Sequence, residues 1–240
     1  MTIKPYSTAL ALAVASVSLG AQADSSDVIA ISDWNYGALY EAGGLQAENL
    51  MDEEVFGPTG EEIGSVENLI ISVDNRIVAV VAQVGGLWDI GDTHVAVAWN
   101  EVELIGDGVR IPVTEDNADD YGLFENEYVT KESLQQIIQV DDDVEAGIRS
   151  WKITELLDDY VTLSNGTGYG YVDDVVFSDN GEIQAIIVEP DTLYGTGPYA
   201  YPYYSYDHGW RPGDPAYRLP YSENDVGELE PFDYSKFDNS

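Results

Sequence analysis

An internal repeat constrains this chain more than any other feature. When the sequence is shifted by 106 residues, residues 49–82 align without a gap on residues 155–188, and nine of the 34 aligned pairs are identical. The stretch RIPVTEDN, which begins at Arg110, returns as RLPYSEND from Arg218, at an offset of 108 residues. Self-similarity at a fixed spacing is typical of a duplicated structural unit, so the chain is predicted to hold two related modules of roughly 80 residues each.

Both repeats have the sequence pattern of β-strands. In the second copy the runs YVDDVVFS and EIQAIIV are joined at Asn180-Gly181, a pair that tolerates the positive φ angles of a type I′ hairpin, and Asp74-Asn75 takes this place in the first copy. Short strands separated by Gly and Asp turns favour closed sheets, because closure removes exposed edges. We therefore expect an all-β fold with two tandem small antiparallel β-barrels and little helix.

The glycine pair Gly64 and Gly170 comes just before the first strand of each predicted hairpin. A sharp bend or a closely approaching backbone excludes a Cβ atom at such positions. Their equivalence in the two copies indicates a role in the architecture.

The predicted organisation has five parts. They are a signal peptide over residues 1–23, an N-terminal extension over 24–47, module 1 over 48–140, a linker over 141–150, and module 2 over 151–240 with an insertion rich in Tyr, Pro and Gly over 189–216. We expect the extension to be partly extended and loosely held, since it has no counterpart in the second copy. A short helix is expected from Thr130, in TKESLQQII.

The first residues have the pattern of a cleavable export signal. Lys4 precedes an apolar stretch, and Ala21-Gln22-Ala23 forms a small-residue cleavage site. The apolar stretch is shorter than the roughly 18 residues that span a bilayer. We therefore expect a periplasmic protein that is not inserted in the membrane after signal cleavage.

Acidic residues dominate the charge. The chain has 9 basic and 45 acidic residues, and loss of Lys4 with the signal leaves 8 against 45, a formal charge of −37. Such a charge repels nucleic acid and anionic headgroups, so neither is an expected partner. The acidity is typical of proteins that stay soluble in high salt, and a divalent-cation role is the alternative.

The residue types that carry catalysis or bind metals are scarce. The chain has no cysteine and only two histidines, His94 and His208, and it has no match to an EF-hand loop or to a Gly-x-Ser-x-Gly nucleophile elbow. We predict no catalytic residue, no metal ligand and no cofactor, and we expect a protein that is not an enzyme.

The first copy resembles the PRC-barrel family of small β-barrels. The resemblance rests on Leu50-x-Asp-x-x-Val55, on the turn GEEIG that ends at Gly64, and on GGLWDIG followed by VAVAW, which ends at Trp99. It covers roughly residues 49–115, and the second copy looks like a more divergent member. The family implies a role in docking and assembly and offers no shared catalytic residues.

The second copy departs from this pattern where the first has GGLWDIG and VAVAW. Its replacement contains PYAYPYYSYDH, residues 198–208, with five tyrosines in eleven positions. Tyrosine is enriched at recognition surfaces, so this segment is a candidate contact surface. The alternative is a lid in which the tyrosines fold back over the second barrel and replace its missing strand. The candidate protein-binding residues are Trp88, Tyr199, Tyr201, Tyr203, Tyr204, Tyr206 and Trp210.

These observations favour a non-catalytic periplasmic interaction or assembly protein that docks onto an unidentified envelope protein. Aromatic anchors would supply affinity, while the acidic surface suppresses unspecific association. The alternative is a periplasmic protein that binds a small ligand or a divalent cation.

Overall fold

The computed structural model describes residues 28–51, 53–85, 93–106, 108–121, 150–204, 210 and 214–237. The predicted signal peptide, the helix expected from Thr130 and the linker up to residue 149 lie outside the described residues.

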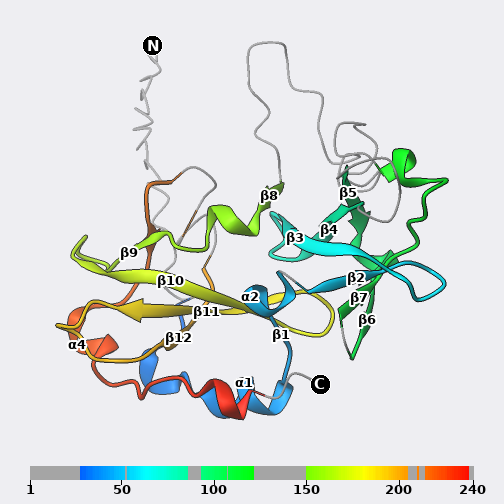
Figure 1. Cartoon of the computed structure of the whole chain (residues 1–240). Helices are drawn as coiled ribbons and strands as arrows, with labels where there is room; N and C mark the ends of the chain where they lie inside the picture. Colours follow the sequence, from blue (N-terminus) through cyan, green and yellow to red (C-terminus); the bar gives the residue numbers. More distant parts are fainter. Residues whose placement is uncertain are drawn as a thin grey trace, which may run out of the picture.

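The described residues form two curled β-sheets, one for each repeat (Figure 1). The module 1 sheet has the order β5-β4-β3-β2-β7-β6, and β8 pairs with β3. Its strands are β2 (Glu54–Phe56), β3 (Glu62–Ser72), β4 (Ile77–Val84), β5 (Thr93–Ala98), β6 (Glu103–Ile105), β7 (Gly108–Arg110) and β8 (Ser150–Lys152). The module 2 sheet has the order β12-β11-β10-β9-β13, and β1 pairs with β10. Its strands are β1 (Leu45–Gln46), β9 (Tyr160–Thr162), β10 (Gly168–Phe177), β11 (Ile183–Pro190), β12 (Tyr199–Pro202) and β13 (Tyr217–Arg218).

The helices among the described residues are short. They are α1 (Tyr36–Ala42), α2 (Ala47–Leu50) and α4 (Glu223–Val226), with 3₁₀ turns η2 (Ile31–Asp33), η3 (Trp99–Glu101), η4 (Ala118–Tyr121), η5 (Ile153–Glu155) and η6 (Tyr234–Lys236). The prediction of an all-β fold of two barrel-like modules with little helix is confirmed. Among the described residues, no helix is long and apolar enough to cross a membrane.

The two sheets are mixed, which corrects the prediction of antiparallel barrels. In module 1, β7 runs parallel to β2, with Val55 beside Val109. In module 2, β13 runs parallel to β9, with Val161 beside Tyr217. In each module the chain returns, after the hairpin strands, to the free edge of the first strand and runs there parallel to that strand. This return makes the sheet curl.

The central hairpins turn through a three-residue loop in place of the expected type I′ turn. In module 2, Ser178 N donates to Glu182 O at 2.9 Å and Gly181 N donates to Ser178 O at 2.8 Å. Among the described loop residues only Gly181 (φ 78°) and its module 1 counterpart Asn75 (φ 59°) have positive φ, whereas a type I′ turn needs two successive residues of this kind. The sequence signal located the turns correctly and misjudged their type.

The glycines before the hairpins are required by a close backbone approach. Of the two reasons predicted for them, a sharp bend or a closely approaching backbone, the structure shows the second. A Cβ atom on Gly64 would lie 1.8 Å from Gln83 O, and one on Gly170 would lie 2.1 Å from Glu189 O. Any larger residue would force β3 away from β4, or β10 away from β11.

Each module completes the sheet of the other. Leu45, which precedes module 1, pairs with Phe177 of module 2, and Trp151, which precedes module 2, pairs with Ile71 of module 1. The offset of 106 residues relates Leu45 to Trp151 and Ile71 to Phe177, so the two pairings are equivalent. The chain is therefore an internal pseudo-dimer that exchanges one short strand in each direction.

The hairpin loops of the two modules meet at the centre of this arrangement. Ile77 N donates to Gly181 O and Ile183 N donates to Asn75 O, both at 2.8 Å. These two hydrogen bonds are again equivalent under the offset of 106 residues, as a local two-fold axis requires.

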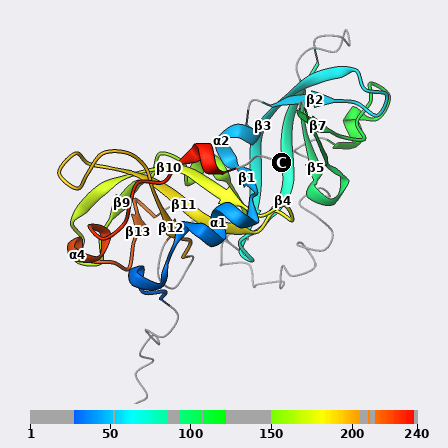
Figure 2. The same ribbon diagram turned by 90° about the horizontal axis from the view of Figure 1, so that it is seen from below.

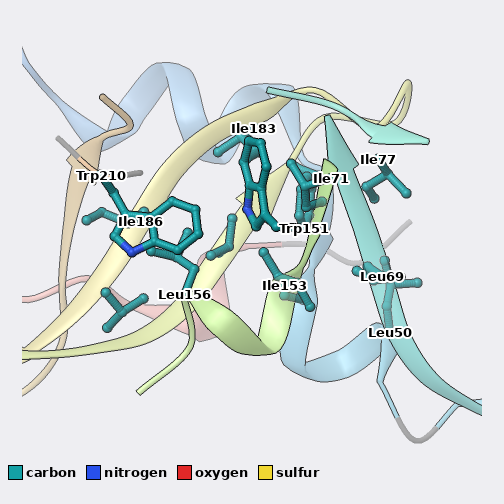
Figure 3. Packing of buried hydrophobic residues seen from close by; sticks show 14 of the residues in the cluster. Leu50, Leu69, Ile71, Ile77, Trp151, Ile153, Leu156, Ile183, Ile186 and Trp210 are labelled. Carbon is teal, nitrogen blue, oxygen red and sulfur yellow. The ribbon is translucent and has the colours of Figure 1, made fainter. Parts of the chain in front are cut away.

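One hydrophobic core runs through both modules. Figure 3 shows Trp151 beside Ile71 of module 1 and Ile183 of module 2, with Trp210 further into module 2. Trp151 is 3% exposed, and its ring centroid lies 5.5 Å from that of Trp210. Because burial of apolar area drives folding, a shared core makes the stability of each module depend on the other.

A second, smaller apolar cluster covers the outer face of the module 2 sheet. In it Leu39 of α1 joins Phe232 and Phe237 from the C-terminal segment, over Ala200 and Ile187 of the sheet. Figure 2 shows the ribbon of α1 against the module 2 sheet. The expectation of a loosely held extension is therefore wrong for residues 28–47, because their apolar side chains have this sheet face to cover. The first four residues of the extension, 24–27, lie outside the described residues.

Candidate functional site

The tyrosine segment supplies the last strand of the second barrel. β12 pairs with β11 in the register in which β5 pairs with β4, so that Ala200 lies opposite Ile187 as Ala96 lies opposite Val81. The sequence YAYP at Tyr199 thus takes the place of VAVA in module 1. This is the lid alternative of the sequence analysis, in the form of a regular strand.

Tyrosines fill the interior of the second barrel where aliphatic residues fill the first. Alignment of the paired strands and of the RIPVTEDN and RLPYSEND segments matches Ile63, Val95, Val97, Val109 and Val113 with Tyr169, Tyr199, Tyr201, Tyr217 and Tyr221. All ten side chains are buried in the shared core. The richness in tyrosine is therefore a property of the barrel interior.

The buried tyrosine hydroxyls satisfy one another. The hydroxyls of Tyr169 and Tyr201 lie 2.6 Å apart, and those of Tyr204 and Tyr221 lie 2.9 Å apart. Burial raises the pKa of Tyr169 to about 12, and it raises the pKa of Tyr201 well above its ordinary value. These groups stay protonated at any physiological pH, and hydrogen bonding offsets the cost of burying them.

The candidate contact residues in this segment are corrected accordingly. Tyr199, Tyr201, Tyr204 and Trp210 are at most 8% exposed, so they do not form an exposed contact surface. Their large rings fill the barrel, and the indole N–H of Trp210 donates to Asp159 Oδ2 at 2.5 Å.

The other candidates are placed less deeply or lie outside the described residues. Tyr203 is half-buried against the core, with its ring centroid 6.1 Å from that of Tyr217. Trp88, Tyr206 and His208 lie outside the described residues. His94 lies at the start of β5 and pairs with Glu67 at 2.6 Å, with both side chains about half exposed, which fits a residue at the rim.

An exposed pair of aromatic rings lies elsewhere on module 2. Tyr160 of β9 and Tyr171 of β10 face each other across the strands, with ring centroids 5.3 Å apart, and they are 37% and 52% exposed. A Cβ atom on Gly168 would collide with the Tyr160 hydroxyl, so the glycine makes room for the ring. We call Tyr160 and Tyr171 the exposed tyrosine pair.

Module 1 has polar residues at the same places. Glu54 and Ser65 form the equivalent cross-strand pair, and Glu62 stands where module 2 has Gly168. Three coordinated differences thus convert an acidic surface into an aromatic one. The offset of 106 residues already aligns these positions in the sequence, so the differences at Glu54, Glu62 and Ser65 are the signal that could have located the exposed tyrosine pair.

A buried carboxylate lies at the junction of the modules. Asp174 Oδ1 accepts hydrogen bonds from Glu48 N at 3.1 Å and Val175 N at 2.7 Å, and Oδ2 accepts from Gln46 Nε2 at 3.1 Å. Burial raises the pKa of Asp174 to about 6 despite these donors. The equivalent residue of module 1 is the neutral Asn68.

The described part of the chain shows no metal-binding site. Its residues contain no group of three or more His, Cys, Asp or Glu side chains placed to hold a metal ion.

Comparison with known families agrees with this architecture. Residues 43–118 match the family model of the PRC-barrel domain. The chain contains a PRC-barrel domain. The match begins just before β1 and ends at the start of η4, so it covers the strands of the module 1 sheet up to β7. The module 2 sheet repeats the order of the corresponding strands, consistent with tandem PRC-barrel modules. No curated protein matches the chain.

Proposed function

We propose that this protein is a non-catalytic, periplasmic interaction module that docks onto a protein of the cell envelope through the exposed tyrosine pair of its second barrel. The proposal combines the export signal read from the sequence with the specialisation of module 2.

The observation that carries the proposal is the set of changes around Tyr160 and Tyr171. Exposed aromatic rings on a sheet lose contact with water when a partner covers them, and tyrosine adds a hydroxyl at low entropic cost. Module 2 has a glycine, Gly168, in β10 where a side chain would collide with the Tyr160 hydroxyl, and glycine weakens a strand. An aromatic pair that only covered its own barrel would be buried, whereas Tyr171 is 52% exposed.

The surrounding charge supports selectivity. The whole chain carries a formal charge of −36, which disfavours contact with other acidic surfaces and with anionic lipids. An apolar contact site in an acidic surface binds a partner that can bury the rings without facing many carboxylates.

The test is affinity capture from a periplasmic and membrane extract with two baits. The first bait is the unchanged protein, and the second is Tyr160→Glu/Tyr171→Ser, which restores the module 1 residues at both positions. We expect a defined partner that the first bait retains and the second loses. Equal capture by both baits would contradict the role of this pair.

A control keeps loss of fold from imitating loss of binding. The variant Glu54→Gln/Ser65→Ala changes the equivalent pair of module 1, and it should capture the partner as the unchanged protein does. All baits are compared by circular dichroism and thermal unfolding first. A partner lost equally with both variants would assign the contact to the acidic surface in general.

A further inference from the structure

A cavity of about 280 Å³ lies between the two ends of the described chain, on the outer layer of module 2. Trp34, Asn35 and Tyr36 line one side, and Glu228, Leu229 and Glu230 line the other. Its volume suits a small ligand or a single side chain. The cavity is separate from the exposed tyrosine pair, since none of its lining residues belongs to β9 or β10.

The aromatic side of the cavity is held in place by the last strand of the barrel. The indole N–H of Trp34 donates to Ala200 O at 2.9 Å, and Ala200 N donates to the Tyr36 hydroxyl at 3.3 Å. Both rings are half-buried. A ring fixed in this way loses little entropy when a ligand binds against it.

The acidic side is held at both of its ends. Glu228 N donates to Asp225 O at 3.1 Å, just after α4, and Phe232 N donates to Pro198 O at 2.7 Å. Glu228 and Glu230 are exposed. In the part of the chain that the structure describes, neither carboxylate takes part in an ion pair.

Aromatic rings and carboxylates together are the surroundings that bind organic cations. The face of Trp or Tyr attracts an ammonium group, with Trp the strongest, and a nearby carboxylate adds Coulomb attraction. The same outer layer already holds one such contact, because Lys236 Nζ lies 5.9 Å from the ring centroid of Tyr40. The surface of this layer is thus compatible with a cation placed over a tyrosine.

We propose that the cavity between Trp34, Tyr36, Glu228 and Glu230 binds an alkylammonium group, as found on a lysine side chain or a free aliphatic amine. The apolar stem of the ligand lies against the rings and Leu229, and its charged end lies toward the two carboxylates. A neutral ligand of the same shape gains only the apolar contact, and an anion is repelled. This site stands independently of the exposed tyrosine pair.

The experiment is a titration of the isotopically labelled protein at low salt, followed by nuclear magnetic resonance. The signal is the indole N–H of Trp34, identified by its absence from Trp34→Phe. The probes are Nα-acetyl-lysine N-methylamide, its uncharged analogue Nα-acetyl-norleucine N-methylamide, and butylammonium chloride. We expect saturable shifts with the two ammonium compounds and much weaker binding of the norleucine compound, which gains only the apolar contact. The tighter of the two ammonium probes identifies the source, a protein side chain or a free amine.

Variants separate the cavity from the acidic surface as a whole. Glu228→Gln/Glu230→Gln keeps the shape of the cavity and should weaken binding about fivefold or more. The control Glu101→Gln/Glu115→Gln removes two exposed carboxylates from module 1 and should leave the affinity unchanged. The proposal is overturned if the Trp34 signal does not move, if the norleucine compound shifts it equally, or if the control weakens binding as much as the cavity variant does.

Discussion

Arg76 and Glu182 occupy the same position in the two repeats, and they pair with each other across the junction. Their backbones form an antiparallel bridge, and Arg76 Nη2 lies 3.6 Å from Glu182 Oε2. A residue meets its own counterpart only at a two-fold axis, so this pair marks the axis of the internal pseudo-dimer. The opposite charges fit the two repeats to each other at this point.

The ion pair itself contributes little to stability, whereas the loop geometry beside it contributes more. The Arg76 and Glu182 side chains are 47% and 58% exposed, so Arg76→Gln should cost less than about 1 kcal/mol in free energy of unfolding. Gly181→Ala should cost about 2 kcal/mol, because the new Cβ atom meets positive φ and would lie 2.8 Å from Trp99 Nε1.

Gly60→Ala is the matched control for this comparison, since Gly60 also has positive φ (88°) but no atom lies within 4 Å of its added Cβ. Urea unfolding of the three variants ranks them. Equal costs for Gly60→Ala and Gly181→Ala would show that the contact with Trp99 carries no weight.

Asp174 should make stability depend on pH. The pKa of about 6 in the folded protein lies above the ordinary aspartate pKa of 3.8, so the folded state holds this proton more strongly than the unfolded state does. The destabilising effect of the charge is therefore fully present above pH 6 and disappears as the pH falls from about 6 to about 4, and its size is on the order of 3 kcal/mol.

Asp174→Asn should remove this dependence, because module 1 already has Asn68 at the equivalent position. We expect the variant to gain stability relative to the unchanged protein at pH 8 and to lose that advantage at pH 4.5, as measured by urea unfolding. The exposed Asp179→Asn serves as control. A stability difference that stays constant between the two pH values would contradict the assignment.

Tyr201 should be among the most costly residues to change in the second barrel. Tyr201→Phe leaves the Tyr169 hydroxyl without its 2.6 Å partner and should cost about 1 kcal/mol. Tyr201→Val places the module 1 residue in a barrel built around tyrosines and should cost about 3 kcal/mol, because it leaves a cavity. Thermal unfolding measures both, and a neutral Tyr201→Val would show that the interior repacks freely.

Much of the fold could be predicted from the sequence, because the repeat, the β-rich runs and the turn residues all act over short distances. The ungapped match of residues 49–82 with 155–188 fixed the two modules, and Gly64 and Gly170 marked the close approach of strands. The exchange of Leu45 and Trp151 between the modules depends on contacts distant in sequence, and the local patterns contain no signal for it.

The tyrosine segment shows why composition misleads about a site. The composition around Tyr199 and Tyr201 is typical of an irregular contact surface, yet pairing with β11 makes the segment an edge strand in which both tyrosine rings are buried in the core of the barrel. The tyrosines are buried because the interior of the second barrel has room for large rings, and the sequence does not show the size of that interior. The exposed tyrosine pair, in contrast, was detectable as a difference between aligned repeats.

The central claim is that the two barrel-like modules form one cooperative body through their shared core and exchanged strands. The most direct test is native-state hydrogen exchange of the slowest amides in β4 of module 1 and β11 of module 2, for the unchanged protein and for Leu163→Ala. Leu163 is a fully buried residue of module 2, and its truncation should cost about 3 kcal/mol. The account predicts that the opening free energy falls by the same amount in both strands. A fall in β11 with β4 unchanged would show that the modules unfold independently and would contradict it.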